Sequence, residues 1–246
     1  MVFRKIIKFQ FEDNSGQNPF IESFIYLKRG IIIPKIEYNK MLTKKQLQLF
    51  NIFQKNKFNE LSFKELKRLS KEKSNSLIQN AISSFLKERL ITEKIIGTSK
   101  LYTINHENKK AYLYFEIINH ENLPKEILKS VKALEDSLDK HTFFYSIIIF
   151  GSYAAGEQKK NSDLDIAVFI EEEEKRKIIE AVFKSMELKS IIKIHGQVFT
   201  KNEFLEMLKV DYENVGKEIA RKHLIIHNSA IFYSILKEGV RHGFKF

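Results

Sequence analysis

Two apolar, β-branched segments flank a polar loop, and this combination restricts the fold of the chain more than any other feature. Residues 144–150 read Phe-Tyr-Ser-Ile-Ile-Ile-Phe, and residues 166–170 read Ile-Ala-Val-Phe-Ile. Continuous runs of this kind are typical of strands that are buried on both faces. The intervening loop begins with Gly151-Ser152 and ends with Ser162-Asp163-Leu164-Asp165. We therefore expect two buried strands whose connection carries the chemically active residues.

The aspartates of this loop are spaced for metal binding. Residues i and i+2 of a strand point to the same face, so Asp163 and Asp165 should project together while Leu164 enters the core. Two carboxylates on one face form a hard oxygen site suited to Mg²⁺ or Mn²⁺. Gly151 lets the backbone approach a phosphate, and Ser152 adds a hydroxyl and an amide donor. A phosphate loop beside a metal pair predicts phosphoryl or nucleotidyl transfer.

The complete pattern from Gly151 to Ile166 resembles the DNA polymerase β-like nucleotidyltransferase superfamily, especially its minimal bacterial and archaeal members. The family motif is Gly-Ser, a spacer containing a small residue and a glycine, and then Ser-Asp-x-Asp before an apolar strand, and every position is filled here. The resemblance implies an α/β (α+β) domain with a small mixed sheet flanked by helices. It also implies Mg²⁺-dependent transfer of a nucleoside monophosphate from a nucleoside triphosphate, with ATP as the expected donor, to a hydroxyl. By this resemblance Asp163 and Asp165 are the catalytic metal ligands, and Gly151, Ser152 and Ser162 bind the nucleotide phosphates.

The chain departs from the family at the third carboxylate, which usually lies on a later strand. Residues 191–199 form that strand-like segment, and they contain no Asp or Glu. His195 or Gln197 occupies the expected position. A histidine there can serve as a base or a metal ligand, but we prefer to interpret it as a polar residue on a degenerate strand. Two hypotheses follow: an enzyme with an altered third ligand, or a nucleotide-binding relic that acts as a sensor.

Residues 41–105 show three helical patterns followed by two strand-like runs, which is the layout of a winged helix-turn-helix. Ser62-Phe63-Lys64-Glu65 is a capping box that predicts the start of the second helix. The third helix is expected over residues 74–88, and the strands over 90–96 and 100–104, separated by Gly97-Thr98-Ser99. The resemblance is one of pattern and covers about a quarter of the chain.

A winged helix predicts contacts with double-stranded DNA through the start of its third helix. Asn and Gln side chains can pair with adenine edges, and lysines can contact phosphates. The candidate DNA-binding residues are Lys73, Ser74, Asn75 and Gln79 on the helix, with Lys94 and Lys100 beside the tip of the wing. The alternative is a winged helix that binds a partner protein.

The remaining segments carry weaker signals. Residues 1–40 are expected to form a β-rich extension, to which we assign no function. Residues 106–141 are predicted to be a helical linker, either a spacer or a surface for homodimerisation. The nucleotidyltransferase domain with its C-terminal helices is placed at residues 142–246.

The composition limits partners and location. The net charge is +11, which favours a polyanionic partner such as nucleic acid, although a lysine-rich proteome would give the same balance. There are no cysteines, so thiolate metal sites are excluded. No apolar run reaches the ~18 residues of a membrane helix, and the N-terminus is broken by charge too early for a signal peptide. We expect a cytoplasmic protein without a membrane partner.

Two classes of function therefore remain open. The first is a nucleotidyltransferase. The second is a DNA-binding transcriptional regulator or antitoxin-like protein whose transferase domain is degenerate and senses a nucleotide or mediates assembly. The basic charge, the winged-helix pattern and the missing third acid motivate the second hypothesis.

Overall fold

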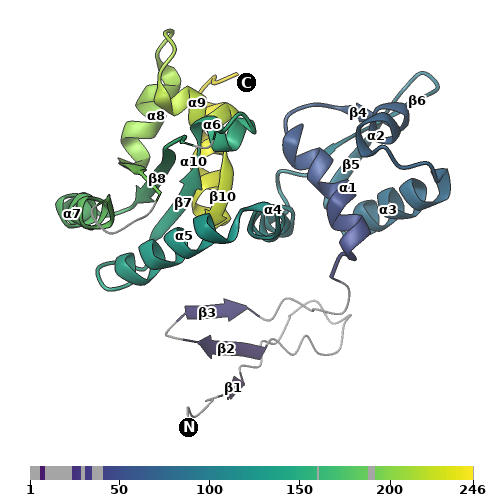
Figure 1. Ribbon diagram of the computed structural model, residues 1–246. Helices are drawn as coiled ribbons and strands as arrows, with labels where there is room; N and C mark the ends of the chain where they lie inside the picture. The colour runs from purple at the N-terminus through teal and green to yellow at the C-terminus, as the bar shows by residue number, and fades with distance from the viewer. Residues whose placement is uncertain are drawn as a thin grey trace, which may run out of the picture. The chain divides into compact units, whose positions relative to one another are not determined.

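The computed structural model describes residues 41–159, 161–187 and 192–245, and also the backbone of three strands nearer the N-terminus. The chain divides into two compact units, Met1–Lys44 and Lys45–Phe246. The first unit contains a three-stranded antiparallel sheet in the order β1-β2-β3 (Figure 1). Its strands are β1 (Ile6–Lys8), β2 (Phe24–Lys28) and β3 (Ile31–Pro34).

The second unit begins with three helices and a small antiparallel sheet in the order β4-β6-β5. Ser62 caps α2 in the expected capping box, because its side chain accepts from the Glu65 backbone while the Glu65 carboxylate accepts from the Ser62 backbone. The elements are α1 (Lys44–Lys55), β4 (Leu61–Ser62), α2 (Phe63–Ser70), α3 (Asn75–Lys87), β5 (Ile91–Ile96) and β6 (Ser99–Ile104). The three helices and then β5 and β6 follow the order that the sequence predicts for residues 41–105, whereas the short strand β4 was not predicted. The assignment of this region as a DNA-binding winged helix stays a prediction.

A four-stranded mixed sheet in the order β10-β7-β8-β9 forms the centre of the rest of the unit. β7 runs antiparallel to both β8 and β10, whereas β8 and β9 are parallel. The two apolar segments of the sequence are β7 and β8, which the short helix α6 and a loop connect. The bounds are β7 (Tyr145–Ile149), α6 (Gly151–Ala155), β8 (Leu164–Ile170), β9 (Ile194–Thr200) and β10 (Leu224–His227).

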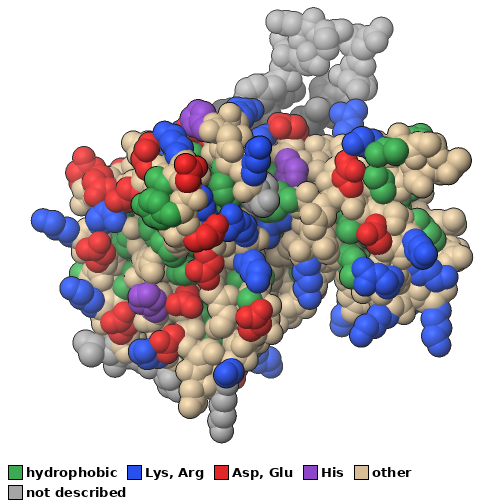
Figure 2. Space-filling model, turned by 90° about the horizontal axis from the view of Figure 1, so that it is seen from above, with side chains coloured by type: hydrophobic (Ala, Val, Ile, Leu, Met, Phe, Trp, Pro, Cys, Tyr) green, Lys and Arg blue, Asp and Glu red, His purple; other side chains and the backbone are tan. Residues whose placement is uncertain are grey.

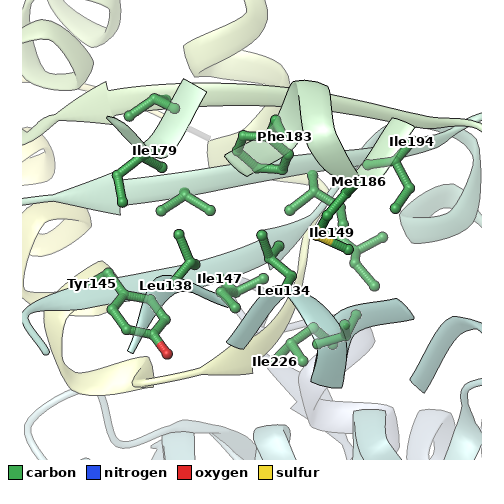
Figure 3. Close-up of a cluster of buried hydrophobic side chains, with 14 of the residues drawn as sticks. Leu134, Leu138, Tyr145, Ile147, Ile149, Ile179, Phe183, Met186, Ile194 and Ile226 are labelled. Atoms are coloured by element: carbon green, nitrogen blue, oxygen red, sulfur yellow. The ribbon is translucent and has the colours of Figure 1, made fainter. Parts of the chain in front are cut away.

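Helices cover both faces of this sheet, and this explains why its central strands are apolar without alternation. On one face, side chains of α5 (Lys125–Leu138) and α7 (Arg176–Glu187) pack against the strands (Figure 3). Ile147 and Ile149 belong to that cluster, whereas Ile148 between them points to the opposite face and is equally buried. Burial of each such side chain contributes roughly 1.5–3 kcal/mol to folding.

Aromatic rings fill the opposite face of the sheet. The Phe169 ring centroid lies 4.9 Å from that of Phe204 and 5.2 Å from that of Phe232, both in edge-to-face geometry. Phe204 belongs to α8 and Phe232 to α10, so these helices close this face. The remaining elements are the 3-10 turn Glu173–Lys175, α8 (Lys201–Lys209), α9 (Val215–Arg221) and α10 (Ser229–Arg241).

The helices of residues 106–141 are packed into this unit and are not a free linker. The buried ring of Phe115 on α4 (Lys109–Asn122) contacts Phe50 of α1, with ring centroids 5.6 Å apart. On the same helix, Tyr112 stacks on Tyr233 of α10 with a centroid separation of 3.8 Å. Leu134 of α5 is fully buried in the core of the mixed sheet. The sequence left a spacer and a homodimerisation surface open here because the pattern shows which faces are apolar but not what covers them.

Within residues 41–159, 161–187 and 192–245, no helix combines the length and the apolar character required to cross a bilayer.

Candidate active site

Gly151 and Asp165 come into direct contact at the end of β7. The Phe150 backbone N–H donates to the Asp165 carbonyl at 3.1 Å, which holds the start of α6 against β8. Gly151 has a φ of +65°, a conformation that L side chains rarely adopt. A Cβ at this position would overlap Asp165 Oδ2. Glycine is therefore required at position 151 for two reasons: the backbone has a positive φ, and a side chain would collide with the Asp165 carboxylate.

Asp163 and Asp165 both reach solvent, whereas Leu164 between them is fully buried. The side chain of Asp163 is 38% exposed and that of Asp165 is 25% exposed. This alternation agrees with the strand geometry that the sequence predicts. Asp165 lies beside the start of α6, and both carboxylates present oxygen atoms of the kind that Mg²⁺ and Mn²⁺ prefer.

Lys193 forms an ion pair with Asp163, which the sequence analysis missed. Its Nζ lies 2.6 Å from Asp163 Oδ2, and this hydrogen bond is the main reason that the pKa of Lys193 is raised. The contact follows from strand pairing, because the Leu164 backbone N–H donates to the Lys193 carbonyl at 2.8 Å. The signal in the sequence was the position of Lys193 two residues before His195, which places both side chains on one side of an extended segment.

His195 occupies the position beside the aspartates, and Gln197 does not. In the parallel pair of β8 and β9, His195 is the register partner of Asp165, whereas Gln197 pairs with Ala167. The His195 Nδ1 atom lies 3.2 Å from Asp165 Oδ1. Among the residues that the structure describes, no cluster of three or more His, Asp or Glu side chains suited to a metal ion is present.

The two candidate serines have different local roles. Ser152 lies in the first turn of α6, and its carbonyl accepts from the Glu157 backbone N–H at 2.9 Å. Ser162 closes the loop before β8, because its Oγ accepts from the Lys159 backbone N–H at 2.8 Å. The Ser162 hydroxyl proton remains able to donate to another group.

The candidate DNA-binding residues near the start of α3 are mostly exposed, and two of them also form hydrogen bonds within the chain. Lys73, Asn75 and Gln79 are exposed. Asn75 Oδ1 accepts from Lys67 Nζ at 2.6 Å. Ser74 is the N-cap of α3, and its side chain accepts from the Leu77 backbone N–H.

The two lysines at the wing are each paired with a glutamate. Lys94 Nζ lies 3.1 Å from Glu60, and Lys100 Nζ lies 3.1 Å from Glu93. Basic and acidic side chains are interspersed over much of the face shown in Figure 2. The local positive charge at the wing is therefore smaller than the lysines alone predicted.

Comparison with known proteins bears on the region around the mixed sheet. No curated protein matches the chain. A solved structure described as "Crystal structure of the toxin-antitoxin with AMP-PNP" is 19% identical, with a TM-score of 0.31, and covers 48% of this chain and 89% of that chain. The family model described as "Nucleotidyltransferase domain" matches residues 124–239, which contain α5, the glycine–serine turn and both aspartates. The region that matches this nucleotidyltransferase model therefore begins at α5, upstream of the central strands.

Proposed function

We propose that residues 124–239 transfer a nucleoside monophosphate from a nucleoside triphosphate, with ATP as the donor, to a hydroxyl acceptor. The reaction is proposed to depend on Mg²⁺ or Mn²⁺. The observation that carries the proposal is the contact of Gly151 with Asp165 beside Asp163, because it joins a close-approach glycine to two solvent-facing carboxylates. This geometry suits a triphosphate that bridges the turn and the carboxylate pair.

The donor atoms present fit a hard divalent cation. Mg²⁺ is commonly held by one or two carboxylates together with substrate phosphates, so Asp163 and Asp165 are sufficient protein ligands. The missing Cβ at Gly151 leaves the Asp165 carboxylate uncovered on that side. When bound, the cation would supply charge neutralisation of the triphosphate and of the transition state.

The surrounding side chains receive supporting roles. We assign Gly151, Ser152 and Ser162 to the nucleotide phosphates, through backbone N–H groups and the two hydroxyls. His195 is assigned the positioning of Asp165, because a hydrogen bond between Nδ1 and Oδ1 would hold one oxygen and leave the other free. The acceptor that binds opposite the phosphates is a hydroxyl of a protein, a nucleic-acid end or a small molecule.

Transfer from α-labelled triphosphates tests this function. The full chain is incubated with each α-³²P-labelled triphosphate, Mg²⁺ or Mn²⁺, and cell extract as a source of acceptors. We expect label transfer with ATP that is lost in Asp163→Asn and in Asp165→Asn. Asp211→Asn is the matched control, because Asp211 is exposed and lies outside the site. Transfer that persists in both site variants would rule out the assigned residues.

A second candidate function is a DNA-binding regulator or antitoxin-like protein with a transferase domain that binds nucleotide without turnover. Two observations favour it: Lys193 pairs with Asp163, and His195 stands where a third carboxylate is expected. Both lower the negative charge available to a divalent cation. In this hypothesis residues 41–105 bind double-stranded DNA or a partner protein, and a homodimer would match a palindromic DNA site.

Salt-dependent binding to duplex DNA separates the second candidate from the first. Affinity that falls steeply with salt, and that weakens in Asn75→Ala and Gln79→Ala, supports DNA recognition. Lys184→Ala, which removes an exposed charge from α7, is the control for nonspecific electrostatics. Absence of duplex binding at low salt would remove the DNA-binding hypothesis and leave the transferase proposal unaffected.

A further inference from the structure

A cavity of about 510 Å³ lies between α1 and the C-terminal end of α6. Residues 153–156 of α6 and its C-cap line one side, and the segment 221–224 before and within β10 lines another. The volume falls in the range of roughly 300–1,000 Å³ that is typical of small-ligand sites. Asp163 and Asp165 do not line it, so the cavity is separate from the candidate active site. The two sites share α6, which contacts Asp165 at its first residue.

Lys57 is a buried cation in the wall of this cavity. It is 7% exposed, and burial alone lowers the pKa of its ammonium group to about 8. Within the described residues, its Nζ has no ion-pair partner, and it lies over the Phe58 ring, 5.8 Å from the ring centroid. A buried ammonium without a counter-charge costs several kcal/mol unless an anion accompanies it. Lys57 is therefore suited to bind an anionic group of a ligand.

A second buried polar side chain, Gln54, also lines the cavity and has an unpaired oxygen. The Ile225 carbonyl can only accept, so Asn119 must donate its Nδ2 to it, at 2.8 Å. The Asn119 oxygen then accepts from Gln54 Nε2 at 2.5 Å. This relay fixes the Gln54 amide and leaves Oε1 buried, with no partner among the described residues. An unsatisfied buried acceptor is uncommon and suits a ligand that brings a donor.

The other charged side chains around the cavity are basic. Lys55, Arg221 and Lys222 line it, and none of its described lining residues is acidic. Arg221 is partly neutralised outside the cavity, because its Nη1 lies 2.5 Å from Glu213. Lys55 and Lys222 are exposed at the rim. Several cations around one buried ammonium favour a ligand with more than one negative charge.

We propose that this cavity is a second ligand site that takes a small phosphorylated molecule. Its phosphate lies at Lys57 with Lys55 and Lys222 at the mouth, and a hydroxyl or amino group of the ligand donates towards Gln54. The site is formed jointly by α1 and the nucleotidyltransferase domain, so its occupancy stabilises their association. The proposal is independent of turnover at Asp163 and Asp165.

Calorimetric titration of the full chain in buffer with EDTA tests this site, with inorganic phosphate, AMP and adenosine as probes. We expect AMP and phosphate to bind in competition with one another, and adenosine to bind at least tenfold more weakly than AMP. Lys57→Met should weaken the binding of AMP about tenfold or more, which corresponds to the loss of a charge-assisted hydrogen bond. Lys222→Glu at the exposed rim should also weaken the binding of AMP, and this substitution does not alter the buried core.

Two control variants keep the result interpretable. Lys64→Met removes an exposed charge from α2, outside the cavity, and should leave AMP affinity unchanged. The double variant Asp163→Asn with Asp165→Asn should likewise bind AMP as the wild type does. Equal affinity of Lys57→Met, Lys222→Glu and wild type would overturn the proposal, as would a failure of phosphate and AMP to bind. Loss of AMP binding in the aspartate variant alone would move the ligand to the candidate active site.

Discussion

His195 Nδ1 lies 3.2 Å from Asp165 Oδ1, across the parallel pairing of β8 and β9. In the family that the motif resembles, a third carboxylate is expected in this region of the site. The imidazole instead contacts an aspartate and adds no negative charge. The site consequently has two carboxylates, of which one is paired with histidine and the other with Lys193. This arrangement determines how strongly a divalent cation can be held.

Replacing His195 by aspartate is expected to complete a three-carboxylate site. His195→Asp should raise the affinity for Mn²⁺ by about tenfold, because affinity for hard cations rises with the number of charged ligands. The measurement is Mn²⁺ titration followed by electron paramagnetic resonance of the free ion. His195→Asn is the control, because asparagine has the shape of aspartate but carries no charge. If the Asp and Asn variants bind Mn²⁺ equally, residue 195 does not face the cation.

Gly151 and Gly156 form a matched pair for testing the close approach at the turn. Both have positive φ, at +65° and +73°, so alanine should cost each about 1 kcal/mol of unfolding free energy. Only at Gly151 would the added Cβ overlap Asp165, whereas nothing lies within 4 Å at Gly156. Gly151→Ala should therefore lose more stability and also lose transfer activity. Equal effects of the two changes, measured by denaturant unfolding and label transfer, would contradict this contact.

Lys193 is expected to compete with a cation for Asp163. Lys193→Met should raise Mn²⁺ affinity by roughly two- to fivefold, the modest gain expected from removing an exposed ion pair. Lys184→Met makes the same charge change at an exposed position of α7. The two variants are compared with wild type at low and high salt. An equal gain in both variants would show a general electrostatic effect in place of local competition.

The buried Lys57 predicts an unusual dependence of stability on pH. Its pKa is about 8 in the folded protein, against 10.5 for an unperturbed lysine, so between these pH values the unfolded state binds more protons. The free energy of unfolding should therefore gain a contribution that rises with pH from 8 to 10.5. From ~1.4 kcal/mol per pKa unit, that contribution is on the order of 3 kcal/mol.

Lys57→Met should remove this contribution and make the protein more stable near pH 7, since a buried unpaired charge is lost. Urea unfolding of both proteins at pH 7, 8, 9 and 10 gives the difference directly. Because other lysines and tyrosines titrate in the same range, the comparison rests on the difference between the two proteins. A difference that does not change with pH would show that the Lys57 ammonium is well solvated.

Local pattern was sufficient to predict the central strands and the burial of Leu164 between two solvent-accessible aspartates. The apolar runs of β7 and β8 predict burial on both faces, and the i, i+2 spacing predicts that Asp163 and Asp165 share a side with Leu164 buried between them. These inferences depend only on strand periodicity, which the backbone imposes wherever the strand lies.

Features that depend on register or on packing between distant segments were not predictable. The choice between His195 and Gln197 needed the pairing of β8 with β9, and the Lys193 contact followed from the same register. The packed role of α4 and the environment of Lys57 depend on residues that are widely separated in the sequence. A lysine that ends up buried has the same sequence signature as one that is solvated.

Binding of a metal–nucleotide complex tests the central claim most directly, because it does not require knowledge of the acceptor. Mn²⁺ is titrated with a non-hydrolysable ATP analogue into wild type, Asp163→Asn, Asp165→Asn and the control Asp211→Asn, and bound Mn²⁺ is followed by electron paramagnetic resonance. We predict binding to wild type and to Asp211→Asn, with affinity at least tenfold weaker in each of the two site variants. Unchanged affinity in both site variants, or no binding by wild type, would contradict the assignment of Asp163 and Asp165 as the ligands of a nucleotide-bound metal.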